Sequence, residues 1–493
     1  MSATIISERT GAQKQDGASD LRARIRETFE RQQAHRWNVA NTTADERVAK
    51  LKRLKKLMLE RRDDLLRAMA ADFRKPAAEV DLTELQPVLG EINHTIKHLK
   101  SWMQPMKVPT PPQLIGTKSM VRYEPKGLVL ILAPWNYPFN LLMSPLVAAV
   151  AAGNCVVVRP SDKVRQTSAL MATMLRDVFP EDEVAVFTGP SSIANDLLEL
   201  PFDHIFFTGS TRIGKQVMHA AAEHLGAVTL ELGGQSPVVV DETADVDTAA
   251  QRLVWGKFLN GGQTCVAPNH VFVHVSKQAE FVAAARRTIE KHYGATEEDR
   301  QKSPHLCRIV DAPSEKRLRD VVERSVAAGA RLEVGGKFDP ADRYVAPTVL
   351  SNVKDDMPVM EAELFGPVMP VIPFDSLDEV ISAIQRRPKP LAMYVFSESD
   401  RNIERLLSNT TAGGTVINNC IIHLANPDLP FGGIGASGMG NYHGFFGFRA
   451  LSHERAVMVQ SRLATVRLFY PPYTKVVQRA IDALTKVFAL QGR

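Results

Sequence analysis

The sequence predicts an α/β protein built on two parallel β-sheets that are covered by helices on both faces. A chain of 493 residues is too long for one hydrophobic core, so two or three domains are expected. Its 44% hydrophobic and 23% charged residues are typical of a soluble globular protein. Short apolar runs alternate with segments of helical spacing, which is the pattern of parallel strands between two layers of helices.

The N-terminal part of the chain is expected to be mainly helical. Residues 1–20 are polar and lack the apolar stretch of a signal peptide, so they are predicted to form a disordered tail. Residues 21–75 show helical spacing with many charges, and residues 79–104 form an apolar stripe typical of an amphipathic helix. Residues 105–115 contain four prolines and are expected to be extended.

Strands and helices then alternate in two blocks. The first block is predicted to contain strands over 128–132, 155–158, 184–187 and 204–207, with helices over 141–152 and 213–225. The second block runs to about residue 412 and is predicted to contain a strand over 237–240 and helices over 246–258, 278–292 and 315–328. After Pro471 and Pro472 the apolar residues fall on one face of an amphipathic C-terminal helix.

Composition excludes several classes of function. The net charge of +5 is small, and the densest basic run, 50–56, has leucines at helical spacing. We interpret that run as a solvated helix face, so no nucleic-acid partner is expected. The four cysteines lack metal-ligand spacing, which argues against a zinc site or a disulfide framework and favours a reducing, cytoplasmic compartment. No metal site is therefore predicted.

Cys265 is the strongest candidate for a catalytic residue. It follows Asn-Gly-Gly-Gln-Thr, a run expected to form a tight turn that presents the sulfur to a cavity. Glu231 lies 34 residues earlier, and Asn136 lies in a loop between prolines. A nucleophile, a carboxylate and an amide donor are the groups needed to oxidise an aldehyde through a thioester. Taken singly, each has an ordinary alternative, namely an inert buried thiol, a turn-capping carboxylate and a structural amide.

Two segments are candidates for binding a dinucleotide. Residues 207–214 join a strand to a helix and carry small residues where a helix N-terminus offers free N–H groups to a phosphate. The spacing Gly209-x-Thr211-x-x-Gly214 lacks the middle glycine of the usual fingerprint, so a plain strand–helix turn stays possible. Arg159 and Asp162 end another strand, where they either reach an adenosine ribose or form a surface ion pair.

These features occur together with several longer motifs, and as a set they resemble the NAD(P)-dependent aldehyde dehydrogenase superfamily. The resemblance covers about residues 25–472. Its finer details resemble the class 3 branch, which includes fatty-aldehyde, aromatic-aldehyde and coniferyl-aldehyde dehydrogenases. The motifs that carry it are Pro134-Trp-Asn-Tyr-Pro138, Phe207-Thr-Gly-Ser-Thr211, Leu230-Glu-Leu-Gly-Gly234, Gly262-Gln-Thr-Cys265, Glu363-Leu-Phe-Gly-Pro367 and Leu429-Pro-Phe-Gly-Gly-Ile-Gly435.

The resemblance implies a role for each position. Cys265 would be the nucleophile and Glu231 the general base, while the Asn136 side chain and the Cys265 backbone N–H would form an oxyanion hole. Helix N-terminal amides and the nicotinamide cation are expected to favour the Cys265 thiolate. The cofactor, NAD or NADP, would bind through Gly209, Ser210, Thr211 and Gly214 at the pyrophosphate, Glu363 and Phe365 at the nicotinamide ribose and ring, and Arg159 and Asp162 at the adenosine ribose.

The chain departs from the family at Arg159 and Asp162, where Lys and Glu are usual. Because Asp is shorter and Arg pairs with phosphate bidentately, we expect NADP to be accepted, either alone or alongside NAD. A CoA-acylating aldehyde dehydrogenase, a non-catalytic structural homologue and a cofactor-free thiol esterase are the alternative functions. His443 is expected either to contact substrate or cofactor or to make a structural hydrogen bond.

The resemblance also implies a domain plan with two Rossmann-like domains and a small β oligomerisation element. The predicted units are a cofactor-binding domain over 21–105 and 128–230, a catalytic domain over 231–412, a bridging element over 106–127 and 413–440, and a C-terminal segment over 441–493. The bridging element would lie in a homodimer interface. The C-terminal helix would cover the aldehyde entrance, make peripheral membrane contact or pack on its own protein.

Overall fold

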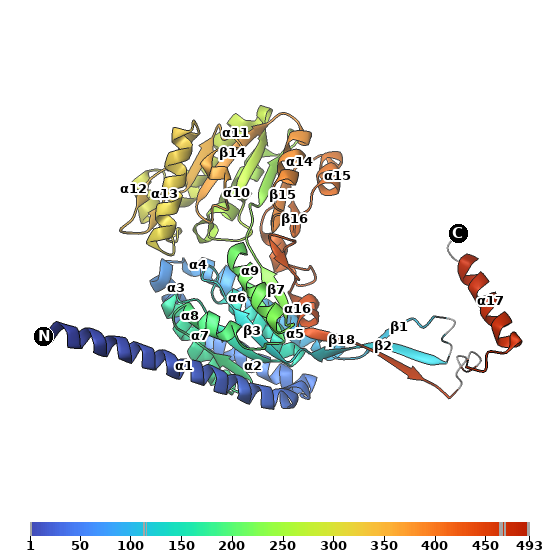
Figure 1. Cartoon of the computed structure of the whole chain (residues 1–493). Helices are drawn as coiled ribbons and strands as arrows, with labels where there is room; N and C mark the ends of the chain where they lie inside the picture. The colour runs from blue at the N-terminus through green and yellow to red at the C-terminus, as the bar shows by residue number, and fades with distance from the viewer. Residues whose placement is uncertain (1, 112–113, 115, 463–466, 468–469, 491–493) are drawn as a thin grey trace.

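The computed structural model describes residues 2–111, 114, 116–462, 467 and 470–490, with side chains from residue 20 onward. It confirms the α/β class. Two helix-covered sheets lie one above the other, and a narrow antiparallel arm extends sideways from the lower one (Figure 1).

The first sheet has six strands in the order β17-β7-β6-β3-β4-β5. Five of them are parallel, and β17 pairs antiparallel with β7 through Gly438 opposite Glu231. The parallel strands are β3 (Leu128–Leu132), β4 (Cys155–Arg159), β5 (Val184–Val186), β6 (His204–Thr208) and β7 (Ala227–Glu231), and β17 spans Gly438–Met439. The helices between them are α6 (Asn140–Ala152), α7 (Arg165–Val178), α8 (Ser192–Leu198) and α9 (Thr211–Glu223).

The second sheet has seven strands in the order β10-β13-β14-β9-β8-β15-β16, and only β10 pairs antiparallel. The strands are β8 (Pro237–Val240), β9 (His270–His274), β10 (Arg331–Val334), β13 (Thr348–Ser351), β14 (Val368–Phe374), β15 (Ala392–Phe396) and β16 (Gly414–Ile417). The helices are α10 (Val246–Phe258), α11 (Gln278–Tyr293), α12 (Glu297–Lys302), α13 (Ala312–Ala327), α14 (Leu377–Arg386) and α15 (Asp400–Asn409), and β11 (Phe338–Asp339) and β12 (Tyr344–Val345) form a separate ribbon.

The N-terminal helices pack on the first sheet. They are α1 (Ser2–Ala40), α2 (Ala44–Glu60), α3 (Arg62–Phe73), α4 (Ala77–Val80), a π-helical turn η1 (Asp81–Leu85) and α5 (Gln86–Trp102). The sequence predicts a disordered tail over 1–20, whereas the backbone is helical from Ser2. That first part of α1 points away from the packed body, which the helix joins only near residue 20 (Figure 1).

The antiparallel arm corrects the predicted bridging element. It consists of β1 (Met106–Val108), β2 (Thr117–Pro125) and β18 (Ser452–Gln460), and β18 pairs with β2 along its whole length. Residues 413–440 were predicted to belong to the bridging element together with 106–127, but β16 (Gly414–Ile417) pairs parallel with β15 at the edge of the second sheet. A strand that joins a partner more than three hundred residues away leaves no local signal. The other domain boundaries remain predictions.

Helix α17 (Lys475–Leu490) follows the arm and contacts none of the packed body. None of its side chains is buried, and it lies beyond the outer end of the arm, far from either sheet (Figure 1). It therefore does not cover an entrance between the two sheets of its own chain. Among the described residues no helix is long and apolar enough to cross a membrane.

Candidate active site

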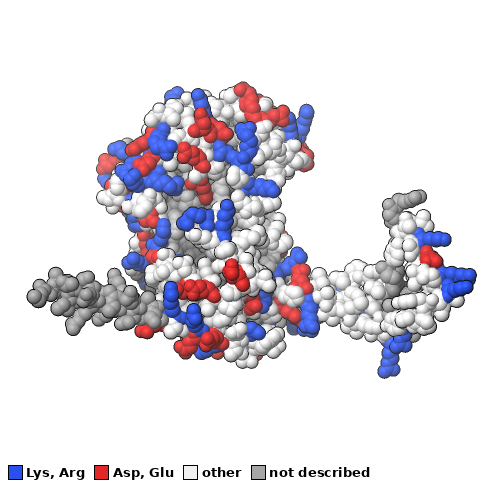
Figure 2. Space-filling view, in the orientation of Figure 1, with Lys and Arg blue, Asp and Glu red and all other residues white. Residues whose placement is uncertain are grey.

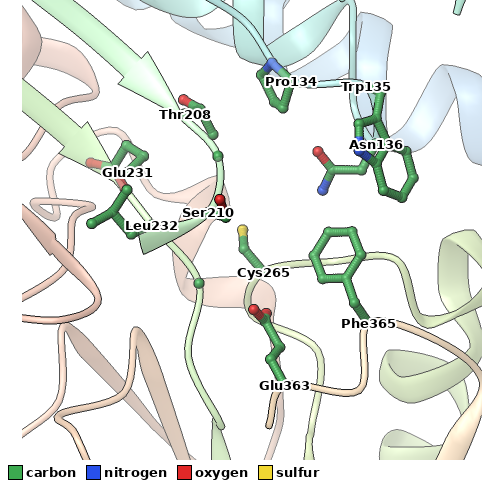
Figure 3. Close-up of a pocket in the computed structure, with 12 residues that line it drawn as sticks. Pro134, Trp135, Asn136, Thr208, Ser210, Glu231, Leu232, Cys265, Glu363 and Phe365 are labelled. Carbon is green, nitrogen blue, oxygen red and sulfur yellow. The ribbon is translucent and has the colours of Figure 1, made fainter. Parts of the chain in front are cut away.

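A cavity of about 210 Å³ opens at the carboxyl ends of the first sheet, where the second domain faces it. Three segments of the first domain line it, namely 134–136, 208–210 and 231–233, together with Cys265, Glu363 and Phe365 from the second domain (Figure 3). The fold thus brings together Asn136, Gly209, Ser210, Glu231, Cys265, Glu363 and Phe365, all predicted from sequence. Ligands of parallel sheets bind at this edge because the strand-to-helix loops converge there.

The turn before Cys265 has an unusual backbone. Helix α10 ends at Phe258, and Asn260, Gly261 and Gly262 then take positive φ angles of 55°, 60° and 72°. Asn and Gly tolerate this left-handed conformation better than other residues. A Cβ at Gly262 would lie 2.3 Å from the carbonyl oxygen of Gly366. The Asn-Gly-Gly run therefore exists because the chain must reverse tightly here to present Cys265.

Asn136 is fixed with one N–H left for a substrate. Its Nδ2 donates to the carbonyl oxygen of Gln263 at 3.0 Å. Asn260 in turn donates from Nδ2 to the Asn136 carbonyl at 2.9 Å and to the Gln263 carbonyl at 3.1 Å. Because an amide nitrogen carries two hydrogens, the second N–H of Asn136 remains for the cavity, which its amide end faces together with the Cys265 sulfur (Figure 3).

The Cys265 thiol is protonated at neutral pH in the free protein. Burial raises its pKa to about 12, and the nearby carboxylates of Glu363 and Glu231 act in the same direction. The backbone N–H groups of Val266 and Cys265 oppose the shift without overcoming it. The sequence predicts that amides and a cofactor cation would favour the thiolate. In the structure the amides are insufficient alone, so activation requires added positive charge.

Glu231 ends β7 and is buried. Burial raises its pKa well above the ordinary value, and neither carboxylate oxygen has a hydrogen-bond partner among the described residues. Its carboxylate is turned away from the Cys265 sulfur in Figure 3. To remove a proton from a water near Cys265, this side chain must rotate into the cavity.

Glu363 and Phe365 close the cavity from the second domain. Burial raises the pKa of Glu363 to about 8, against the opposing effects of the Gly234 N–H and of Lys257 and Arg317. A Cβ at Gly233 would lie 2.0 Å from Glu363 Oε2, so only glycine leaves room for this carboxylate. Phe365 has a φ of 48° and meets the Trp135 ring edge-on, with ring centroids 5.4 Å apart.

The residues at and after the strand–helix turn, 208–214, have two different roles. Gly209 and Ser210 line the cavity, and the Ser210 hydroxyl caps α9 by accepting from the Ile213 N–H at 3.5 Å. Gly214 is buried under Leu232, whose Cδ2 would lie 2.6 Å from an added Cβ. Thr211 donates to the Ala436 carbonyl at 3.0 Å. Gly214 and Thr211 therefore hold the turn in place and do not line the cavity.

Arg159 and Asp162 lie away from the nucleophile, at the end of β4. Arg159 Nη2 is 3.2 Å from Asp162 Oδ1 and donates to the Gly189 carbonyl at 3.3 Å. Arg159 Nε is buried without a partner among the described residues. Arg159 also lines a groove of about 990 Å³ that borders the cavity at the ends of β3 and β6.

His443 does not line this cavity. Its Nδ1 lies 3.4 Å from Glu91 Oε2, and its ring stacks on Tyr442 with centroids 4.2 Å apart. It therefore makes structural contacts, one of the two alternatives that the sequence left open. Within the described part of the chain no group of acidic, histidine and cysteine side chains could hold a metal ion.

Sequence reasoning missed several groups around the cavity. Trp135 belongs to the motif Pro134-Trp-Asn-Tyr-Pro138, but its packing on Phe365 was not predicted. The space that Gly233 leaves for the Glu363 carboxylate was not predicted either. Lys257 is fully buried, and its pKa is lowered to about 7 by burial, against the favourable charge of Glu363. The lysine falls on a helix of mixed polarity, so no sequence signal marks it as internal.

Comparison with known proteins places these features in a family. The chain matches the model of the aldehyde dehydrogenase family over residues 6–457. It is 42% identical to aldehyde dehydrogenase family 3 member B1 of Homo sapiens over 461 residues, 93% of this chain and 95% of that protein. It is 40% identical to 4,4'-diaponeurosporen-aldehyde dehydrogenase of Staphylococcus aureus over 427 residues, 87% of this chain and 92% of that protein.

Solved structures agree. The substrate-bound state of Staphylococcus aureus AldH superposes with a TM-score of 0.89 at 39% identity, covering 94% of this chain and 99% of that chain. A Mycobacterium tuberculosis aldehyde dehydrogenase complexed with NAD+ gives a TM-score of 0.81 at 25% identity, covering 90% of this chain and 91% of that chain.

The raised pKa of Cys265 predicts slow alkylation of the free protein. With a pKa of about 12, only about one thiol in 10⁵ is ionised at pH 7. The rate of iodoacetamide labelling, followed by intact mass, should rise about tenfold per pH unit up to pH 10, and Cys265→Ala should remove this labelling. A plateau below pH 9 would contradict the protonated resting state.

Proposed function

Because this chain belongs to the aldehyde dehydrogenase family of NAD(P)-dependent enzymes, we propose that it oxidises medium- or long-chain aliphatic or aromatic aldehydes to carboxylic acids. The observation that carries the proposal is the meeting of Cys265, Asn136 and Glu363 in one cavity, with Glu231 at its wall. The S. aureus relative is named for a 4,4'-diaponeurosporen-aldehyde, which supports an extended apolar substrate.

The first half of the reaction uses Cys265 and Asn136. The thiolate attacks the aldehyde carbon, and the carbonyl oxygen becomes an oxyanion. The free N–H of Asn136 and the backbone N–H of Cys265 are the donors proposed to stabilise it. Because Asn136 is already held by the Gln263 carbonyl, it needs no reorganisation when the negative charge develops.

The second half uses Glu231. Loss of hydride from the tetrahedral adduct leaves a thioester on Cys265; a bound nicotinamide would be the hydride acceptor. Glu231 then rotates into the cavity and removes a proton from water, which attacks the thioester. Burial raises the pKa of Glu231, so its ionised carboxylate is a stronger base than an exposed glutamate.

A nicotinamide dinucleotide fits the residues present. The groove beside Arg159 and the cavity beside Cys265 meet at the ends of β3 and β6, so an extended ligand can occupy both. The N-terminus of α9, with Ser210 and Gly209, suits the pyrophosphate, and the unpartnered Arg159 Nε suits an anionic or hydroxyl acceptor. When bound, the nicotinamide supplies the hydride acceptor and positive charge near Cys265.

We propose that both NAD and NADP are used. Asp162 can accept from the ribose hydroxyls of NAD, and Arg159 can pair with the 2′-phosphate of NADP. In the structure Asp162 Oδ1 lies 3.2 Å from Arg159 Nη2, so a 2′-phosphate has to compete with this carboxylate for the guanidinium group. NAD is therefore expected to be the better substrate, with NADP accepted.

The arm and α17 suggest how the protein assembles and where it lies. β18 is the exposed edge of the arm, and β16 is an edge of the second sheet, so a homodimer that pairs such edges is proposed. Four free cysteines support a reducing, cytoplasmic compartment. The exposed apolar residues of α17, among them Val476, Val487 and Phe488, with basic side chains beside them (Figure 2), suit peripheral contact with a membrane.

The overall activity is tested by reduced-cofactor absorbance with hexanal, a long-chain aldehyde and cinnamaldehyde. Cys265→Ala should abolish oxidation and keep cofactor binding, because the thiol touches the reacting carbon and not the dinucleotide groove.

Glu231→Gln should show a normal first turnover followed by a slow steady state, with an acyl-enzyme visible by intact mass. Normal steady-state turnover of Glu231→Gln would remove Glu231 as the base, and turnover that requires CoA would favour the CoA-acylating alternative.

The ion pair at β4 predicts a change in cofactor preference. In Asp162→Ala, Arg159 no longer has a carboxylate partner and can pair with a 2′-phosphate. The ratio of kcat/KM for NADP to that for NAD should rise about tenfold or more, equivalent to about 1.4 kcal/mol. Arg159→Ala should lower it. An unchanged ratio in both variants would show that neither residue meets the adenosine ribose.

The α17 proposal predicts binding to anionic vesicles. The full chain should co-sediment with phosphatidylserine-containing vesicles, and a chain that ends at residue 473 should lose most of this binding while it keeps activity on a short aldehyde. Equal binding by both chains would assign any membrane contact to another surface.

A further inference from the structure

A cluster of charged side chains lies beneath the reaction loops and takes no part in the chemistry described so far. It consists of Lys75 and Glu84, which are buried, and Glu79, which is half-buried. All three come from the short segment between α3 and α5, which includes the π-helical turn η1. The cavity lining contains none of them.

Lys75 and Glu84 form a fully buried ion pair. Their Nζ and Oε1 atoms are 2.7 Å apart, and both side chains are 0% exposed. Such a pair is an inefficient source of stability, because removing two charges from water costs about as much as their attraction returns. Burial raises the pKa of Glu84 while Lys75 opposes that shift. A role in positioning neighbouring residues explains the presence of the Lys75–Glu84 ion pair better than a role in stability does.

The pair contacts the loop that carries Asn136. Glu84 Oε2 accepts from the Asn140 backbone N–H at 3.0 Å, so the carboxylate caps the N-terminus of α6 directly after that loop. Lys75 Nζ lies 4.0 Å from the centroid of the Tyr137 ring, a cation–π contact. These two contacts fix the loop at its C-terminal end, through Asn140, and at Tyr137, the residue that follows Asn136.

The Tyr137 side chain also contacts the loop that carries Cys265. The Tyr137 hydroxyl lies 2.6 Å from the Thr264 hydroxyl, and Thr264 directly precedes Cys265. The Tyr137 side chain therefore links the two loops, because Tyr137 directly follows Asn136 and its hydroxyl contacts Thr264. Lys75 lies against the face of the Tyr137 ring.

Glu79 reaches the nucleophile loop by a second route. Its Oε2 accepts from the Asn260 backbone N–H at 2.9 Å. Asn260 has the left-handed conformation that starts the tight turn, and its side chain holds the carbonyls of Asn136 and Gln263. Glu79 therefore holds in place the residue on which the turn depends.

We propose that Lys75, Glu79 and Glu84 are positioning residues for aldehyde oxidation, which fix the distance between the Asn136 amide and the Cys265 sulfur. This inference rests on the proposed function. Misplacing a reacting group by about 1 Å can cost about 10²-fold in rate, so contacts that hold two loops from different domains in register have a large effect on kcat. They would act through Asn140, Tyr137 and Asn260, since none of the three lines the cavity.

The first experiment separates positioning from stability. Lys75→Met leaves a buried unpaired carboxylate, so it should lower both Tm and kcat. The double variant Lys75→Met with Glu84→Leu replaces the pair by apolar side chains and should restore Tm. Its kcat should stay about tenfold or more below that of the wild type, because Asn140 has lost its acceptor and Tyr137 its cation. The Kd for NAD, measured by protein fluorescence, should change less than about twofold.

The second experiment uses a conservative rescue. Glu79→Ala removes the acceptor of the Asn260 N–H and should lower the rate of the first turnover about tenfold. Glu79→Gln retains a carbonyl oxygen at that place and should recover most of the rate. Asp81→Asn is the matched control, because Asp81 lies on the adjoining turn and pairs outward with Arg62, so its kcat should equal that of the wild type.

The outcomes are distinguishable. If the wild type oxidises no aldehyde, the proposed function fails. If the wild type is active and kcat recovers together with Tm in the double variant, the pair is only structural and the proposal is overturned for Lys75 and Glu84. If Glu79→Ala and Glu79→Gln share the same first-turnover rate, it is overturned for Glu79. Should Lys75→Met not fold, the double variant and the Glu79 pair still decide.

Discussion

The contact between two loops from different domains is the constraint on which the site depends. Cys265 belongs to the second domain and Asn136 to the first, so neither domain alone brings the two side chains together. The hydrogen bonds from Asn136 to Gln263 and between Tyr137 and Thr264 join the two loops within two residues of Cys265 and at Asn136 itself. The domain interface and the reaction geometry are therefore the same set of contacts.

The electrostatics of the resting site follow from burial. The pKa values of Cys265, Glu231 and Glu363 are all raised, because each group lies in a space with little water and few donors. The uncharged forms are thus favoured before a cofactor binds. Positive charge placed near the sulfur would favour the thiolate, so under the proposed function ionisation of the thiol would depend on whether the dinucleotide is bound.

The sequence alone predicted much of the site, for local reasons. The glycines and asparagine before Cys265 signal a left-handed turn, and the strand that ends at Arg159 begins with a continuous apolar run. The strand that ends at Glu231 is interrupted by Thr229 and was not predicted. Long-range pairing could not be predicted in the same way. In β18 four polar residues precede four apolar ones, a pattern that does not reveal its partner β2. Residues 413–440 were assigned to the bridging element, whereas β16 lies in the second sheet. Lys75 and Glu84 resemble surface charges of a polar helix, and only the packing of η1 against α6 shows that they are internal.

The late return of the chain to its earliest sheets has a consequence for how the molecule is made. Strand β17 closes the first sheet beside Glu231, and β18 completes the arm begun by β2, yet both lie in the last sixty residues. More than two hundred residues of chain therefore separate β7 from β17, and more than three hundred separate β2 from β18. Until those late strands are synthesised, the edges of β7 and β2 are open to pairing with other strands, and such long-range pairings form slowly.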